Sequence, residues 1–225
     1  MKFLITVLLA LLCSPSLIEA RGGGHDKITD YDYHDYMNET IQSKTFIRYK
    51  DGVATDLVWS FDRSIPGEVL RTDIATISGG DDIVRKATSK FTPTTESFGL
   101  VQTERFNTDT VPPALIDTRT FSPPVVFLGD SMVPGSAWAS AGEMNSTFNG
   151  LSGFIDKREV VGVENVSVTA GSFHDCLKVH VLTRIGTNAQ ADIEMNWICP
   201  DIGVVKSVRG RGTALLELVS VTYNE

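Results

Sequence analysis

The 225-residue chain is short of the residues on which most enzymes and nucleic-acid-binding proteins depend. Its 20 lysines and arginines are outnumbered by 28 aspartates and glutamates, so the net charge is −8. An acidic chain is poorly suited to nucleic acid, whose phosphates need clustered lysine and arginine. There is no phosphate-binding loop, no dinucleotide fingerprint and no zinc-type spacing of histidines and cysteines. The sequence therefore predicts no cofactor, no metal and no nucleic-acid partner.

Long apolar runs are also scarce, and the one candidate lies at the N-terminus. Met1 and Lys2 precede an apolar stretch over 3–12, and Ala20 before Arg21 fits a signal-peptidase site. The stretch is shorter than the roughly 20 residues that span a bilayer. We therefore expect a signal peptide over 1–20, a secreted or periplasmic protein, and no membrane span in the mature chain.

Cysteine is rare as well, and removal of the signal peptide leaves Cys176 and Cys199. An oxidising compartment would allow them to form a disulfide. Symmetry about the loop between their segments places Cys176 opposite Cys199, whereas matching the apolar faces shifts the register by one residue and separates them. The sequence therefore does not decide between a Cys176–Cys199 disulfide and two separate cysteines. Asn38, Asn145 and Asn165 begin glycosylation sequons, with ordinary polar turns as the alternative.

Short β-type runs separated by turn residues make up most of the chain. Residues 21–40 are rich in glycine, aspartate and tyrosine and predict a loose acidic leader. From residue 41 to 225 the runs recur regularly, as where Lys50-Asp51-Gly52 separates two of them. No window predicts a long amphipathic helix. The pattern is typical of one antiparallel all-β domain.

The segments 175–184 and 191–198 predict a hairpin with one apolar face. Alternate residues share a face, which groups Leu177, Val179 and Val181 on the first segment and Ile193, Met195 and Trp197 on the second. Burial of both sets on one side predicts that Val179 pairs with Met195 or Trp197, and that the other side is wetter. The densest basic group, Lys206, Arg209 and Arg211, is expected to be a solvated strand edge.

Two segments of this region resemble a known family. Residues 171–179 (GSFHDCLKV) resemble the AGTF-DCLKV segment of the TapB-like secreted proteins, and residues 197–206 (WICPDIGVVK) resemble their WYAPGVGLVK segment. Residues 128–130 with Trp138 are similar to their GD-W segment. The resemblance covers about residues 120 to 210. The residues that carry it are Gly171, Phe173, Asp175, Leu177, Trp197, Pro200, Gly203 and Lys206.

The resemblance implies export and a curled antiparallel sheet, a β half-barrel similar to the LolA-like group, and it implies no activity. Cys199 departs from the family, which has a small residue there. The motif residues also have structural interpretations. Gly171 and Gly203 suit positive backbone angles, Pro200 ends strand pairing, and Trp197 offers apolar surface for a core.

Three groups of residues were considered as reaction centres. Residues 129–131 (Gly-Asp-Ser) are similar to the start of a serine-hydrolase block, but no histidine follows His180. His174 beside Asp175 could orient an imidazole, although a surface turn explains the pair better. The histidines and acids of the leader could gather a divalent cation, but a solvated acidic arm is favoured. We therefore predict no catalytic residue.

The sequence thus favours an exported, non-enzymatic β half-barrel that binds an apolar or lipid-like ligand on its concave face. The ligand class follows from fold analogy. One alternative is a structural or assembly component of an exported surface system, which would bind a protein partner by strand addition at an open sheet edge. A hydrolase is the second alternative.

Overall fold

Twelve antiparallel strands follow one another in the described part of the chain. The computed structural model describes residues 33–80, 82–186, 190–210 and 214–224. The expected signal peptide, its cleavage site at Ala20 and Arg21, and residues 21–32 of the leader lie outside this part. The strands are β1 (Ile41–Lys50), β2 (Val53–Asp62), β3 (Val69–Ile77), β4 (Ile83–Pro93), β5 (Phe98–Asn107), β6 (Ala114–Leu128), β7 (Ala137–Ser146), β8 (Gly150–Val168), β9 (Gly171–Ile185), β10 (Asp192–Cys199), β11 (Gly203–Arg209) and β12 (Ala214–Tyr223).

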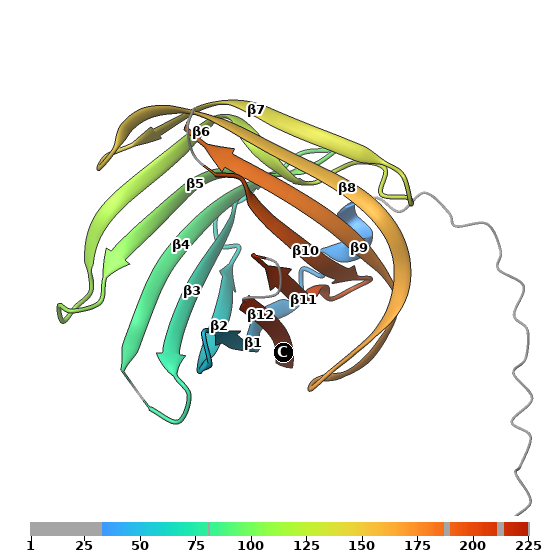
Figure 1. Ribbon diagram of the computed structural model, residues 1–225, viewed down its shortest axis with the longest axis horizontal. Helices are drawn as coiled ribbons and strands as arrows, with labels where there is room; N and C mark the ends of the chain where they lie inside the picture. Colours follow the sequence, from blue (N-terminus) through green and yellow to red (C-terminus); the bar gives the residue numbers. More distant parts are fainter. Residues whose placement is uncertain (1–32, 81, 187–189, 211–213, 225) are drawn as a thin grey trace, which may run out of the picture.

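The sheet closes on itself as a barrel (Figure 1). Each strand pairs with its sequence neighbours, and β12 returns to pair with β1 from Ile41 opposite Tyr223 to Lys50 opposite Ala214. The predicted all-β antiparallel class is confirmed. The expected half-barrel continues round to a closed ring because the last strand reaches the first. Within the described part of the chain, no helix is long and apolar enough to cross a membrane.

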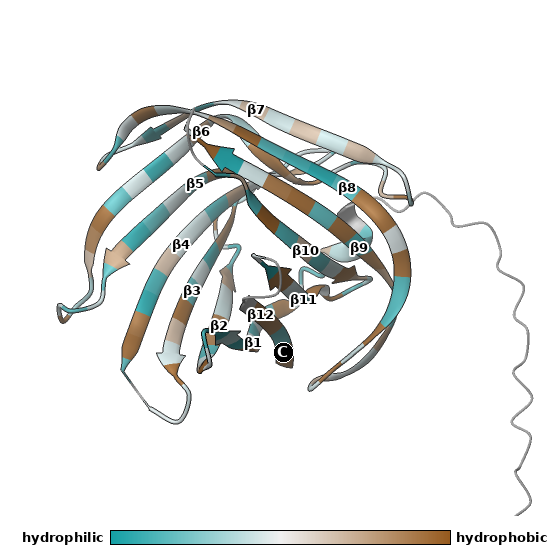
Figure 2. Cartoon of the chain, in the orientation of Figure 1, coloured by the Kyte–Doolittle hydropathy of each residue, from teal (hydrophilic) through white to brown (hydrophobic). Residues whose placement is uncertain are grey.

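Sequential antiparallel connections give the barrel two different ends. The turns β1–β2, β3–β4, β5–β6, β7–β8, β9–β10 and β11–β12 share one end, which we call the open end. The remaining turns share the other, which we call the packed end. The predicted turn at Lys50-Asp51-Gly52 joins β1 to β2, with φ of 51° at Asp51 and 80° at Gly52. Hydrophilic and hydrophobic positions alternate along the strands, as Figure 2 shows for β8 and β9.

The packed end is filled by apolar side chains and by the residues just before β1. The helix η1 (Tyr33–Tyr36) buries Tyr36 completely, and Phe91 stacks on Phe98 with ring centroids 4.7 Å apart. Tyr36 and both phenylalanines belong to one cluster, against which Met37 packs. Asp201 N donates to Asp35 O at 2.7 Å. Residues 33–37, expected to be part of the loose leader, are therefore built into the fold.

The register between β9 and β10 differs from the one predicted from apolar faces. Val179 lies opposite Asn196, and Trp197 lies opposite Lys178. The predicted pairing of Val179 with Met195 or Trp197 is therefore wrong. The inner wall of the barrel accepts polar side chains such as the buried Asn196. Apolar matching therefore does not decide the register.

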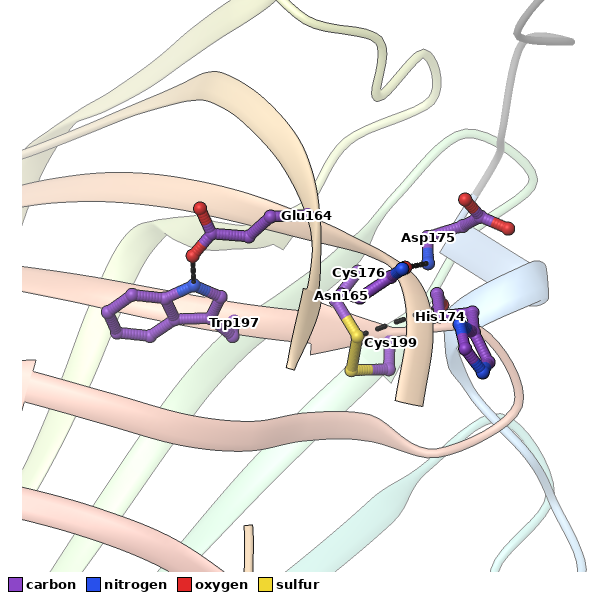
Figure 3. Close-up of a disulfide and its surroundings, with 7 residues drawn as sticks. All are labelled: Glu164, Asn165, His174, Asp175, Cys176, Trp197 and Cys199. Atoms are coloured by element: carbon purple, nitrogen blue, oxygen red, sulfur yellow. Dashed lines mark hydrogen bonds between the residues drawn. A yellow bond between two sulfur atoms is a disulfide. The ribbon is translucent and has the colours of Figure 1, made fainter. Parts of the chain in front are cut away.

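This register resolves the cysteine alternatives in favour of a bond. Leu177 lies opposite Ile198, so the next residues, Cys176 and Cys199, also meet. Their disulfide has a Cα–Cα distance of 4.0 Å, and both cysteines are buried (Figure 3). They lie in a cluster with Val166 of β8. The β8–β9 hairpin continues past β10, and its tip is held where Ala170 N donates to Leu218 O at 3.0 Å.

Candidate functional site

A cavity of about 820 Å³ occupies the barrel interior toward the open end. Its wall is strongly basic, because seven of the chain's eleven arginines line it together with Lys86. The acidic side chains of the lining are Asp73, Glu104 and Asp156. In an acidic protein this concentrates positive charge on one internal surface. The lining arginines are Arg48, Arg71, Arg85, Arg105, Arg119, Arg158 and Arg209.

Three of these arginines are held by an aspartate two residues away on the same strand. On β3, Arg71 Nε lies 2.8 Å from Asp73 Oδ1. An arginine and an aspartate two residues apart also form an ion pair on β6 and on β8. On β8, Arg158 Nε lies 2.7 Å from Asp156 Oδ1. Residues i and i+2 of a strand share a face, so each pair forms without help from another strand. On β6, the corresponding Arg119 Nε to Asp117 Oδ2 distance is 2.7 Å.

Asp117 shows how firmly this wall is built. Burial alone would raise its pKa, but hydrogen bonds from Ser146 Oγ (2.7 Å), the Arg119 guanidinium and Phe148 N (3.3 Å) outweigh burial and lower the pKa. The carboxylate therefore stays charged and keeps Arg119 in place. The same hydrogen bonds tie β6 to the β7–β8 turn.

The arginines nearest the open end have a different environment. Arg48, Arg85 and Arg105 each lie within three residues of a turn or strand end there. Among the residues that the structure describes, no carboxylate lies within ion-pair distance of these three. Arg209, at the end of β11, pairs with Asp192. We call Arg48, Arg85 and Arg105 the mouth arginines.

Repulsion between neighbouring arginines contributes to a lowered pKa at Arg85 and at Arg209. The wall around Arg85 displaces part of its water and lowers its pKa; Asp73 opposes the shift, and Arg48, Arg71 and Arg105 add to it. The pKa of Arg209 is lowered by burial and then by Arg48. Arginine side chains in proteins are charged near neutral pH. The mouth is thus an assembly of like charges that an anion would stabilise.

An apolar surface completes the cavity lining. Phe121 of β6 and Phe154 of β8 meet edge to face, with ring centroids 5.4 Å apart. Leu100 and Ile185 pack against the same cluster, and all four line the cavity. The cavity is therefore amphipathic: its basic side chains come from β1, β3, β4, β5, β6, β8 and β11, and the apolar side chains of this cluster come from β5, β6, β8 and β9.

Lys44 lies deeper, beside a hollow of about 40 Å³ at the packed end. It is buried and donates to Ile202 O, and its Nζ lies 5.7 Å from the Phe61 ring centroid. Burial, followed by repulsion from Arg71 and Arg63, lowers the pKa of Lys44 to about 7. This hollow has room for a few water molecules and is far smaller than the cavity at the open end.

The residues that carry the family resemblance surround the disulfide rather than the cavity. Gly171 and Gly203 have φ of 138° and 74°, as predicted. A Cβ on Gly203 would lie 2.9 Å from Tyr36 O, so the close approach of η1 also requires glycine there. Pro200 follows the last residue of β10, as predicted, and the buried Leu177 faces the interior cluster.

Trp197 is only partly buried and packs against the disulfide cluster, so the predicted core role holds in part. It lies on the outer side of β10, where its Nε1 donates to Glu164 Oε1 (Figure 3). Lys178 and Lys206 place their Nζ atoms 5.2 and 5.5 Å from its ring centroid. Lys206 also pairs with Glu217 at 3.2 Å. Trp197 therefore anchors a cation–π and ion-pair group on the outside of the barrel.

The other predicted positions are dispersed. Asp175 has φ of 54°, and its N–H contacts Asn165 Oδ1 at 3.2 Å, while Phe173 packs against the disulfide cluster. Asn145 is exposed, and Asn38 caps a turn by accepting from Thr40 N at 2.9 Å. The exposed His174 lies on the β8–β9 hairpin, and residues 129–131 lie in or beside the β6–β7 connection.

The solvated edge expected for the basic group Lys206, Arg209 and Arg211 is only partly found. Lys206 lies outside, Arg209 lines the cavity, and Arg211 lies outside the described residues. The cavity arginines are not among the site residues predicted from the sequence. A signal was present in the repeated spacing of arginine and aspartate at i and i+2, which occurs at Arg71, Arg119 and Arg158 within strand-like segments.

The barrel thus defines the chain as a closed, antiparallel all-β protein with a basic interior. Over residues 129–209 it is similar to the DUF3108-like family. This stretch contains the disulfide and both motif segments. The resemblance to TapB-like proteins stays a prediction, because the match found is to the DUF3108-like family.

Two crystal structures share the fold. One is of a protein from Bacteroides fragilis classed as exported, with a YmcC-like fold; it is 17% identical, has a TM-score of 0.52, and the match covers 86% of this chain and 100% of that chain. The other is of a protein from Parabacteroides distasonis classed as a lipoprotein, with 16% identity, a TM-score of 0.52 and the same coverage. No curated protein matches. These likenesses show the fold alone.

Proposed function

We propose that this chain is an exported, non-enzymatic barrel that binds an anionic amphiphile in its interior cavity. The observation that carries the proposal is the grouping of Arg48, Arg85 and Arg105 on the wall without a carboxylate partner in the described structure. A bound carboxylate, phosphate or sulfate would accept charge-assisted hydrogen bonds from them and relieve their mutual repulsion.

The wall formed by β6, β8 and β9 supports an apolar portion of the same ligand. Phe121, Phe154 and Ile185 present apolar surface there. A volume of about 820 Å³ lies within the range of small-molecule sites. We therefore narrow the lipid-like ligand expected from the sequence to one with an acidic head group, since a neutral ligand would leave the mouth arginines without a partner.

Export is supported by the N-terminal signal pattern and by the resemblance to TapB-like secreted proteins. The two structural neighbours, classed as an exported protein and a lipoprotein, agree with that compartment. Strand addition has less support, because every strand pairs with two neighbours. A hydrolase has less support as well, since residues 129–131 lie outside the cavity lining.

Native mass spectrometry of the mature protein, with dodecyl phosphate and dodecanol as probes, tests the proposal. We expect dodecyl phosphate to bind and dodecanol to bind at least about tenfold more weakly, because only the phosphate engages the arginines. The double variant Arg85→Gln/Arg105→Gln should lose this preference. Arg184→Gln, on an exposed arginine outside the cavity lining, is the matched control and should keep it. Equal binding of both probes, or the same loss in Arg184→Gln, would overturn the proposal.

A further inference from the structure

Large apolar side chains are exposed in a ring around the open end of the barrel. Of the fifteen that are exposed in the described part of the chain, eleven lie on or beside the turns of this end. Val111 is 99% exposed and Phe148 is 77% exposed. Scattered exposed apolar residues are ordinary, but a collection at one end indicates an interaction surface. The most prominent are Val53, Ile77, Val111, Leu115, Phe148 and Leu151, which we call the apolar rim.

The apolar rim is distributed over separate turns. Val53 belongs to β1–β2, Ile77 to β3–β4, Val111 to β5–β6 and Phe148 to β7–β8. The turns β3–β4, β5–β6 and β7–β8 project along the left side of Figure 1. Such a ring offers no continuous groove for a peptide. It suits a fluid apolar medium, into which each turn can insert on its own.

The cavity mouth and the apolar rim belong to the same end of the barrel. Arg48 precedes the β1–β2 turn by three residues, Arg85 lies two residues into β4, and Arg105 lies two residues before the end of β5. Positive charge behind the apolar rim is complementary to acidic lipid head groups. Asp51, Asp82 and Asp109 are exposed on the same turns, so the attraction comes from the mouth and not from the turns.

We infer that the apolar rim docks the barrel onto the surface of a lipid bilayer that contains acidic lipids, with the cavity mouth facing the head groups. This inference rests on the proposed function, because docking in this orientation lets an anionic amphiphile pass between bilayer and cavity without crossing water. A second copy of the chain is a less suitable occupant. Contact between two such rims would bring two basic mouths together, and their repulsion would oppose it.

Flotation of the mature chain with vesicles of phosphatidylcholine and phosphatidylglycerol tests the inference. We expect the wild type to float with the vesicles, and Val111→Asp/Phe148→Asp to bind at least about tenfold more weakly, since two apolar groups lose their insertion. Ile65→Asp is the matched control, because Ile65 is 59% exposed at the packed end. This variant should float as the wild type does. Circular dichroism and unfolding midpoints establish that all variants fold.

The outcomes separate docking from ligand binding. Absence of wild-type flotation, or equal loss in the Ile65→Asp variant, would overturn the docking inference even if dodecyl phosphate binds in solution. A wild-type dimer that Val111→Asp/Phe148→Asp dissociates, measured by sedimentation equilibrium, would assign the rim to a second copy and would also overturn it. Flotation that depends on Val111 and Phe148 without any preference for dodecyl phosphate would support docking while the proposed function fails.

Discussion

Arg158 and Asp156 lie side by side on the inner wall of β8, with Nε and Oδ1 2.7 Å apart and both side chains buried. Thr183 Oγ1 of β9 donates to the second carboxylate oxygen at 2.7 Å. The guanidinium carbon lies 4.5 Å from the centroid of the Phe127 ring. These contacts fix the arginine before any ligand arrives, and a fixed charge binds an anion at a lower entropic cost than a mobile one.

Replacement of Asp156 should therefore destabilise the barrel. In Asp156→Asn the Arg158 guanidinium remains buried without a counter-charge, so we expect a loss of about 3 kcal/mol in the free energy of unfolding. Urea denaturation monitored by circular dichroism measures the loss. The control is Asp156→Leu/Arg158→Met, in which neither charge remains and the loss should be smaller. A double variant less stable than Asp156→Asn would show that the pair is not the cause.

Much of the fold could be predicted from alternation and turns. The turn at Lys50-Asp51-Gly52 and the end of β10 before Pro200 are where the sequence places them. Closure of the barrel could not be predicted, because the pairing of β12 with β1 joins segments from opposite ends of the chain. Alternation within a strand contains no information about such a distant partner.

The site was harder to predict for a related physical reason. Alternation in the sequence predicts polar faces in solvent and apolar faces inside. In this barrel Arg48 and Asp73 line the interior, while Trp197 lies outside beneath two lysines. This barrel encloses a cavity of about 820 Å³ instead of a solid apolar core, so its inner wall tolerates charge, and polarity alone no longer distinguishes the two faces.

The register of β9 and β10 can be tested by two substitutions. Val179 is fully buried, so Val179→Ala should cost about 2 kcal/mol in the free energy of unfolding. Trp197 lies half-buried on the outer side, where phenylalanine keeps an aromatic ring beside the two lysines, so Trp197→Phe should cost less than about 1 kcal/mol although tryptophan is larger than valine. Chemical denaturation of both variants measures the order. The reverse order would return Trp197 to the core and contradict the observed register.

The disulfide should stabilise the region that resembles the known families. Cys176 and Cys199 are 23 residues apart, and closure of a loop of this size contributes about 3 kcal/mol. We expect Cys176→Ala/Cys199→Ala to lose about this amount in guanidinium denaturation. A reducing agent should lower the stability of the wild type and leave the variant unchanged. If reductant affects both equally or neither, the bond does not form in the protein.

Lys44 should make the stability depend on pH above neutrality. Its pKa is about 7 in the folded protein against an ordinary value of 10.5. Between these values the unfolded chain holds a proton that the folded protein does not, so the free energy of unfolding rises with pH. The slope is at most about 1.4 kcal/mol per pH unit, and it disappears below about pH 7, where both states are protonated.

Lys44→Met removes this contribution and leaves the other titrating groups in place. We therefore expect the stability difference between wild type and Lys44→Met to change by about 2 to 3 kcal/mol in favour of the wild type from about pH 7 to about pH 9. Urea denaturation across this range measures it. The exposed Lys50, replaced by methionine, is the control and should give a constant difference. Parallel curves for wild type and Lys44→Met would mean that Lys44 keeps its proton in the folded barrel, and that burial beside Phe61 does not control its charge.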